Sequence, residues 1–250
     1  MNAAPAELTS EVVAPIPLVP LTVIVTTLNE EAAIEHCLRR IVAVLPDGAE
    51  VLVIDGGTDR TGEIVERLSL ELPSVRYFRN VGDRGKGHAV HVGLERARGE
   101  YLLQIDADLQ FLPEEMPVLL APLQSGRADL VLGSRFLKGA RRLPGSTPPL
   151  RRLGNWLVSW YATLLFGRRM TDVLAGMKAW KRDVTQQVRL TSENCSYDAE
   201  LPVKAVAAGF RVVDVPITTD ARHGGVSAIR VFRDGRRILT DLTCFRLGWK

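Results

Sequence analysis

The sequence has few cysteines and no long hydrophobic segment, and both absences narrow its possible functions. The three cysteines, Cys37, Cys195 and Cys244, lie far apart, form no Cys-x-x-Cys pair and have no histidine at metal-ligand spacing. This pattern excludes a disulfide framework and a zinc site, and it is typical of a reducing compartment. A membrane-spanning helix needs roughly 20 mostly apolar residues, whereas the best candidate, Leu153–Phe166, is shorter and flanked by arginines. We therefore expect a cytoplasmic protein that does not cross a membrane.

The composition is that of an ordinary folded protein without a strong charge bias. Hydrophobic residues make up 46% of the chain and charged residues 24%, and 32 basic against 29 acidic residues give a net charge of +3. Such a balance excludes general disorder and gives no reason to expect nucleic acid as a partner. Residues 1–20 contain four prolines and no lysine or arginine. They lack the basic region and apolar core of a signal peptide, so we expect a flexible tail.

Short β-branched runs alternate with segments whose apolar residues recur at helical spacing. The predicted strands are Leu21–Val25, Glu50–Ile54, Val75–Phe78, Tyr101–Ile105 and Asp129–Leu132. The predicted helices are Glu30–Val44, Thr61–Leu72, His88–Ala97 and Pro113–Gln124. This alternation predicts an α/β fold with a mostly parallel sheet covered by helices on both faces. Ligands bind such sheets beyond the carboxyl ends of the strands, so functional residues are expected there.

One segment is devoid of acidic residues. Between Asp129 and Asp172 every charged residue is basic: Arg135, Lys138, Arg141, Arg142, Arg151, Arg152, Arg168 and Arg169. Within it, about residues 137–169 form a basic amphipathic insertion whose large apolar residues share one helical face: Leu150, Leu153, Leu157, Trp160, Tyr161 and Leu164. A second stripe closes the chain over residues 230–250: Val231, Ile238, Leu242, Phe245 and Trp249. Each helix could pack against the sheet, but two basic amphipathic helices in one chain favour an anionic membrane surface.

Two carboxylates, Asp106 and Asp108, directly follow the apolar strand Tyr101–Ile105. Carboxylates separated by one residue at a strand end can bind a hard divalent cation, which prefers oxygen ligands and keeps positions open for phosphate oxygens. Gln110 adds a neutral oxygen on the same side as Asp108. The motif alone is weak, because surface turns are rich in aspartate. Its position after a buried strand makes it the main candidate for a metal site.

The loop after the third strand, from Gly82 to Gly87, contains a lysine between glycines but is not a Walker loop. Asn80 stands where the first glycine belongs, and Gly87 stands where a serine or threonine must follow Lys86. No Gly-x-Gly-x-x-Gly motif follows any strand either, which disfavours both common nucleotide-binding folds. Lys86 remains suited to a phosphate. Asp55, followed by two glycines at the end of the second strand, could accept a hydrogen bond from a nucleobase.

Taken in order, these motifs resemble those of family 2 glycosyltransferases, and most closely the dolichyl-phosphate mannose synthase group of polyprenyl-phosphate glycosyltransferases. The matching segments are Thr26–Glu30, Asp55–Thr61, Gly85–Gly87, Asp106–Gln110, Gly133–Arg135, Thr171–Asp172 with Gly176, Tyr197–Glu200, and Arg222 with Gly225 and Ser227. The resemblance runs from about Leu21 to the C-terminus. Eight motifs in the right order are far more specific than any one of them.

The resemblance implies a GT-A fold, a nucleotide-sugar donor and a catalytic domain over residues 21–229, followed by the C-terminal helix. It implies Mg²⁺ or Mn²⁺ held by Asp106, Asp108 and Gln110. It assigns the donor nucleotide to Thr26, Leu28, Glu30, Asp55, Lys86, Asp106 and Arg222. It assigns the acceptor phosphate to Arg135, Arg222 and Ser227, and the reacting centre to Asp172 together with Asp106, Asp108 and Arg135. The sequence departs from the family pattern at Thr26 and Leu28, which replace a proline and an aromatic residue, and at Ile54, which replaces the first of two acids.

The resulting expectation is an inverting enzyme that moves a hexose, mannose or glucose, from a nucleotide sugar such as GDP-mannose to a polyprenyl or dolichyl phosphate at the membrane surface. A phosphate monoester is largely dianionic at neutral pH, so it needs orientation and charge screening rather than a strong base. One alternative is a soluble family 2 enzyme that uses Asp172 or Asp198 as the base for a neutral hydroxyl. A sugar-phosphate nucleotidyltransferase is disfavoured, because Thr26–Glu30 is not a glycine-rich loop. A non-enzymatic binding protein is the remaining alternative.

Overall fold

The protein is described by a computed structural model covering residues 19–224 and 230–248. A seven-stranded sheet has the order β3-β2-β1-β4-β7-β5-β8, and a two-stranded sheet pairs β6 with β9. The strands are β1 Val19–Thr27, β2 Glu50–Asp55, β3 Val75–Arg79, β4 Gly99–Asp106, β5 Leu130–Ser134, β6 Arg141–Arg142, β7 Lys178–Lys181, β8 Val212–Pro216 and β9 Thr218–Thr219. All neighbours in the large sheet are parallel except β7, which is antiparallel to both β4 and β5. The predicted α/β architecture is confirmed.

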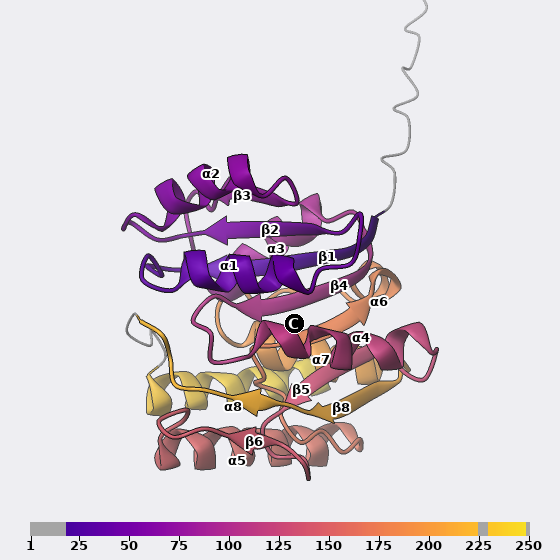
Figure 1. The fold of residues 1–250 in the computed structure, drawn as a ribbon. Helices are drawn as coiled ribbons and strands as arrows, with labels where there is room; N and C mark the ends of the chain where they lie inside the picture. The colour runs from indigo at the N-terminus through magenta and orange to yellow at the C-terminus, as the bar shows by residue number, and fades with distance from the viewer. Residues whose placement is uncertain (1–18, 225–229, 249–250) are drawn as a thin grey trace, which may run out of the picture.

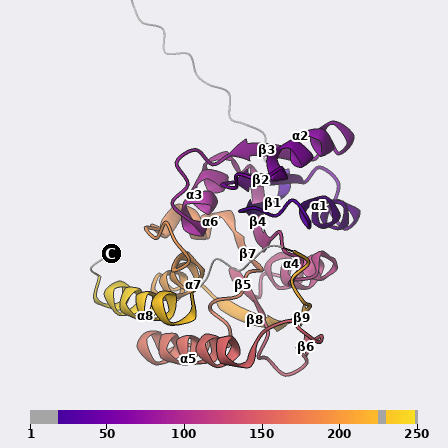
Figure 2. The same ribbon diagram turned by 90° about the vertical axis from the view of Figure 1, so that its left-hand side faces the viewer.

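Helices cover both faces of the sheet (Figures 1 and 2). They are α1 Ile34–Ala43, α2 Thr61–Glu71, α3 Lys86–Arg96, α4 Met116–Gln124, α5 Pro149–Phe166, α6 Arg182–Gln187, α7 Tyr197–Ala207 and α8 Val231–Leu247, with a 3-10 turn at Pro113–Glu115. Alternate residues of each central strand enter opposite cores: Val23 packs with α1, α2 and α4, whereas Ile24 packs with α3 and the later helices. A strand buried on both faces reads as a continuous apolar run, which is why β1, β2 and β4 were predictable.

The sequence did not predict β7, which inserts between β4 and β5. This strand is only four residues long and carries lysines at both ends around Ala179 and Trp180. Neither an apolar run nor a clear alternation is present, so no sequence pattern indicates a strand here. Its position is set by tertiary pairing, with Gln104 of β4 opposite Lys178.

Helices α5 and α8 lie side by side along one end of the molecule (Figures 1 and 2) and pack on each other. The apolar stripe of α8 belongs to the core, since Ile238, Leu242 and Phe245 are all buried. The hypothesis that the apolar stripe of α8 faces a membrane is therefore wrong. Trp249 lies outside the described residues.

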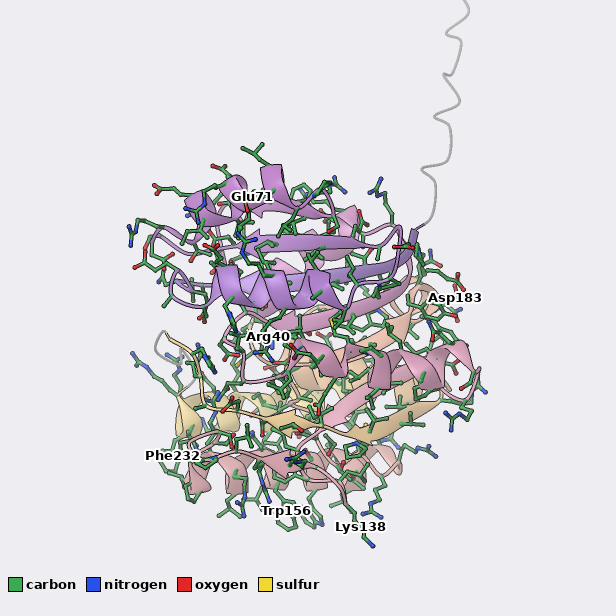
Figure 3. All side chains as sticks on the ribbon, in the orientation of Figure 1. Arg40, Glu71, Lys138, Trp156, Asp183 and Phe232 are labelled. Carbon is green, nitrogen blue, oxygen red and sulfur yellow. The ribbon has the colours of Figure 1, made fainter. Side chains whose placement is uncertain are left out.

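Helix α5 packs through one face and exposes most of its large apolar residues on the other, although Tyr161, Leu165 and Phe166 pack partly buried against the core. Val158, Ser159 and Ala162 are buried, while the exposed apolar side chains are Leu150, Leu153, Trp156, Leu157, Trp160 and Leu164. Figure 3 shows Trp156 at the outer edge of this end of the molecule, together with Phe232 of α8. Core packing therefore does not account for the large apolar face of α5. Among the described residues, no helix is both long and apolar enough to cross a bilayer.

The contact of α3 with β1 depends on a glycine, and this generates a stability prediction. A Cβ added to Gly93 would lie 2.8 Å from Cγ2 of Ile24, which is fully buried. Overpacking a closed core costs about 1–3 kcal/mol, and the change from Gly to Ala gains about 1 kcal/mol in helix propensity, so Gly93→Ala should lower the free energy of unfolding by up to about 2 kcal/mol. The matched control is Gly235→Ala in α8, where a Cβ meets open space, and which should be neutral or stabilising. Urea denaturation measures both, and equal effects would contradict the packing argument.

Candidate active site

A cavity of about 400 Å³ opens at the carboxyl ends of β1 and β4 and extends towards α5 and α8. The predicted site residues that line it are Thr26, Leu28, Glu30, Lys86, Asp106, Asp108, Gln110, Arg135 and Arg222. Asp55 and Asp172 are fully buried behind its wall, and Ser227 lies outside the described residues. The structure thus brings together side chains from positions 26 to 222, as expected from the strand-end rule.

The two candidate metal ligands each carry a basic partner. Lys86 Nζ lies 2.7 Å from Asp106 Oδ1, and Arg222 Nη2 lies 2.7 Å from Asp108 Oδ2. Burial, followed by the charge of Asp106, raises the pKa of Asp108. Gly176 packs against Asp106, and a Cβ at this glycine would collide with the carboxylate. The site therefore concentrates negative charge at the end of β4 and balances it with side chains from distant segments.

These residues fit a hard divalent cation that keeps most of its coordination positions for other ligands. Among the described residues, no group of three or more histidine, cysteine or acidic side chains is placed to hold a metal. Two carboxylates therefore fit an ion that takes phosphate oxygens and water as further ligands, as Mg²⁺ does. Gln110 donates its side-chain amide to the carbonyl of Ser146 at 2.7 Å, so its role as a third ligand stays a prediction.

The loop that carries Arg222 is bound to the loop that carries Asp108. The backbone amide of Asp220 donates to the carbonyl of Gln110, and that of His223 donates to the carbonyl of Asp108, both at 3.0 Å. Arg222 also donates to Glu30 Oε1 at 2.8 Å. A single guanidinium therefore connects the segments that follow β1 and β4, and its contact with donor or acceptor phosphate stays a prediction.

Glu30 is the acidic group in the cavity whose protonation is most sensitive near neutral pH. Burial raises its pKa to about 7, against the opposing effect of Arg222. Its second oxygen, Oε2, is buried and has no hydrogen-bond partner within the described parts of the chain.

The expectation that Asp55 contacts a nucleobase does not match its geometry. Its Oδ1 accepts from Thr27 Oγ1 and from the backbone amide of Gly57, both at 2.9 Å, and its Oδ2 accepts from Arg79 at 3.0 Å. The side chain is fully buried. Asp55 therefore holds the turn between β2 and α2 to the end of β1, and the strand pattern could not reveal that the carboxylate turns inward.

The sequence predicts that Arg135 binds a phosphate, but in the structure its guanidinium pairs with a carboxylate. Its Nε donates to Asp172 Oδ2 at 2.6 Å and its Nη2 to Asp172 Oδ1 at 2.8 Å, a bidentate pair in which Asp172 has no exposed surface. Asp172 is therefore a fixed partner of Arg135 behind the cavity wall. Arg135 still lines the cavity, so contact of its guanidinium with phosphate stays a prediction.

Asp198, the other candidate base, is held by two lysines. Lys178 donates to its Oδ1 at 2.9 Å and Lys86 to its Oδ2 at 3.0 Å. These ammonium groups keep the pKa of Asp198 below its ordinary value even though burial opposes them. Neither Asp172 nor Asp198 is therefore arranged to take a proton from an acceptor.

Arg151, at the start of α5, is a cavity residue that sequence reasoning did not single out. It lines both the main cavity and a smaller cleft between α5 and α8. Burial, and then the charges of Arg135 and Arg222, lower its pKa. Within residues 19–224 and 230–248 no ion pair joins it to a carboxylate. In the sequence the two adjacent arginines belong to one basic run. Only the fold shows that Arg151 is partly buried in the cavity whereas Arg152 is exposed.

The α/β fold and the charged cavity at its strand ends are those of an enzyme that binds a phosphorylated ligand beyond its sheet, and comparison with known proteins identifies the family. Residues 22–175 match the family model described as glycosyl transferase family 2. This match covers more than half of the chain. The chain belongs to glycosyltransferase family 2, and the nucleotidyltransferase and non-enzymatic alternatives are not supported.

Several curated proteins are similar over most of the chain. A low-salt glycan biosynthesis hexosyltransferase of Haloferax volcanii is 35% identical over 222 residues, 87% of this chain and 51% of that protein. An undecaprenyl-phosphate mannosyltransferase of Micrococcus luteus is 30% identical over 82% of this chain and 85% of its own length. A polyprenol monophosphomannose synthase of Mycolicibacterium smegmatis is 32% identical over 82% and 79%. The chain thus spans about half of the first relative and most of the other two. The resemblance to the polyprenyl-phosphate group is confirmed.

Solved structures confirm the GT-A fold. Glucosyl-3-phosphoglycerate synthase from Mycobacterium tuberculosis, in complex with Mn²⁺, UDP and glucosyl-3-phosphoglycerate, superposes with a TM-score of 0.70 over 92% of this chain and 80% of that one. Sequence identity is 22%, so this likeness establishes the fold and not the substrate.

The raised pKa of Glu30 predicts a pH effect on stability. A carboxyl whose folded pKa of about 7 exceeds the ordinary 4.5 stabilises the folded state below pH 4.5, and this contribution is lost as the pH rises through 7. Without metal, the unfolding free energy should therefore fall between pH 5 and pH 8 by up to about 3 kcal/mol. Glu30→Gln, which can still accept from Arg222, should flatten that dependence. Urea denaturation in EDTA at both pH values measures it, and parallel profiles for the two proteins would contradict the assignment.

Proposed function

We propose that this enzyme is an inverting hexosyltransferase that uses a nucleotide-sugar donor and a polyprenyl or dolichyl monophosphate acceptor at a membrane surface. The observation that carries the proposal is Arg151, a half-buried cation in the cavity with no carboxylate partner in the described chain. A buried unpaired charge is costly and requires a counter-ion. A phosphate monoester supplies one, and an arginine binds it in a two-pronged geometry.

Neither of the two carboxylates expected to act as the base for a hydroxyl, Asp172 or Asp198, is free, and this supports a phosphate nucleophile over a hydroxyl. A neutral hydroxyl needs a general base within hydrogen-bond reach, yet Asp172 is fixed by Arg135, and Asp198 is fixed by Lys86 and Lys178. A phosphate dianion needs no deprotonation, only orientation and screening. Arg135 and Arg151 are placed to supply both, and Arg222 stays a candidate for either phosphate.

The donor fits the other half of the cavity. Thr26, Leu28 and Glu30 line the cavity at the end of β1. Because β1 lies between β2 and β4 in the sheet, a nucleoside held there could extend its diphosphate towards β4. A divalent cation bound by Asp106 and Asp108 would supply Lewis-acid stabilisation of the departing nucleoside diphosphate. Lys86 contacts Asp106 and is positioned to pair with a diphosphate oxygen. A single in-line displacement from the acceptor side then inverts the anomeric carbon.

Peripheral membrane attachment is proposed through α5. Its exposed leucines and tryptophans form a helical stripe, and exposed arginines at 141, 142, 152, 168 and 169 stand near both its ends. An interfacial helix gains from apolar insertion and from attraction of about 1 kcal/mol per basic residue to anionic lipid. A membrane seated on α5 would bring a lipid phosphate to Arg151, which starts the same helix.

The acceptor assignment is tested by Arg151→Met with Arg152→Met as the matched control. Transfer of labelled mannose or glucose from GDP- or UDP-sugars to undecaprenyl phosphate should fall at least a hundredfold in Arg151→Met, because the phosphate loses its unpaired cation. Arg152→Met removes the same charge from an exposed neighbouring position and should keep activity within about threefold. EDTA should stop transfer in every variant.

Equal losses in the two variants would indicate general membrane attraction in place of a phosphate site. Transfer to water-soluble hydroxyl acceptors, with none to undecaprenyl phosphate, would favour the soluble family 2 alternative.

Membrane attachment is tested by flotation with liposomes containing anionic lipid. Wild-type protein should float at low salt and less so at high salt, because salt screens exposed charges. Changing Trp156 and Trp160 to serine should reduce the floated fraction severalfold. The control is the exposed Leu70, on α2 at the other end of the sheet, whose change to serine should have no effect. A wild-type protein that never floats would contradict the proposal.

A further inference from the structure

A buried lysine outside the cavity is connected to the candidate metal ligand by a chain of alternating charges. Lys178 has no exposed surface and does not line the cavity. It binds Asp198 through both the side-chain Oδ1 at 2.9 Å and the backbone carbonyl at 3.0 Å. Asp198 binds Lys86, and Lys86 binds Asp106. The charges therefore alternate from the interior of β7 to the end of β4.

The sheet register explains how Lys178 comes to face this site. Lys178 pairs with Gln104 across β4 and β7, and Asp106 lies two residues beyond Gln104. Residues two apart on a strand share a face, so the lysine lies on the face of the sheet that carries Asp106. Burial lowers the pKa of Lys178, while Asp198 and, more weakly, Asp106 raise it. The electrostatic interaction thus extends from the lysine to the metal ligand itself.

We propose that Lys178 is a positioning residue that sets the balance between cation and anion binding in the cavity. Its charge neutralises Asp198, so that Lys86 is shared between Asp198 and Asp106 and remains available to a diphosphate. Without Lys178, Asp198 keeps Lys86 for itself and adds an unbalanced negative charge behind Asp106. The cavity then attracts a divalent cation more strongly and a diphosphate less strongly. This inference rests on the metal and donor sites of the proposed function.

The opposite signs of these two effects distinguish an electrostatic role from a structural one. In Lys178→Met the affinity for Mn²⁺ alone should rise roughly tenfold, and the affinities for GDP and UDP in EDTA should fall by a similar factor. Free Mn²⁺ is measured by electron paramagnetic resonance and nucleotide binding by equilibrium dialysis. The matched control is Lys181→Met, which removes the same charge from the same strand where Lys181 pairs with Asp129 at 3.0 Å. It should change neither affinity more than twofold.

A joint weakening of Mn²⁺ and nucleotide binding in Lys178→Met would show a merely structural role and overturn the inference, as would no change in either. If circular dichroism shows that Lys178→Met does not fold, Lys178→Gln makes the same comparison, since it keeps an N–H donor for Asp198 without the charge. Wild-type protein that binds no Mn²⁺ would overturn the metal site and this inference together. Wild-type binding of Mn²⁺ without tightening in the variant would overturn the inference alone.

Discussion

The site depends on one constraint: carboxylates at the end of a buried strand must have cationic partners. Asp106 at the end of β4 and Asp108 just beyond it line a cavity that is also lined by Lys86 of α3 and by Arg222. A buried carboxylate without a partner would lose its charge or destabilise the fold. Lys86 and Arg222 satisfy this need, and in doing so they fix segments more than a hundred residues apart around the cavity. The site is thus held together by ion pairs that a metal and a diphosphate could replace.

Under the proposed function, such an exchange would let an ordered site bind highly charged ligands. A divalent cation at Asp106 and Asp108 would take over their charge and free Lys86 and Arg222 to face phosphate oxygens. Lys86 and Arg222 would then need little movement between their two roles, and preorganised groups stabilise developing charge at small reorganisation cost. A ligand in the cavity cannot replace Asp172 as the partner of Arg135, because Asp172 is fully buried. The guanidinium of Arg135 therefore keeps a fixed orientation.

The sequence predicts the framework of this arrangement well, for identifiable reasons. Central parallel strands are continuous apolar runs, so β1, β2 and β4 and the polar residues after them could be located. What could not be predicted depends on tertiary pairing. Nothing in the motif shows that Asp55 turns inward to Arg79, that Asp172 faces Arg135, or that the short β7 places Lys178 beside Gln104. Local sequence places a side chain at a strand end, but only the packed neighbours decide which way it points.

Helix α5 shows the same limit on the surface of the protein. Its periodicity predicts an amphipathic helix correctly, yet periodicity cannot tell whether the large or the small residues face the protein. The fold buries Val158, Ser159 and Ala162 and leaves both tryptophans and the leucines at positions 150, 153, 157 and 164 exposed. A soluble surface gains nothing from that orientation. It becomes favourable when the outer medium is partly apolar. The same helix carries Arg151, which lines the cavity. One segment therefore packs on α8, exposes an apolar face and supplies a cation to the site.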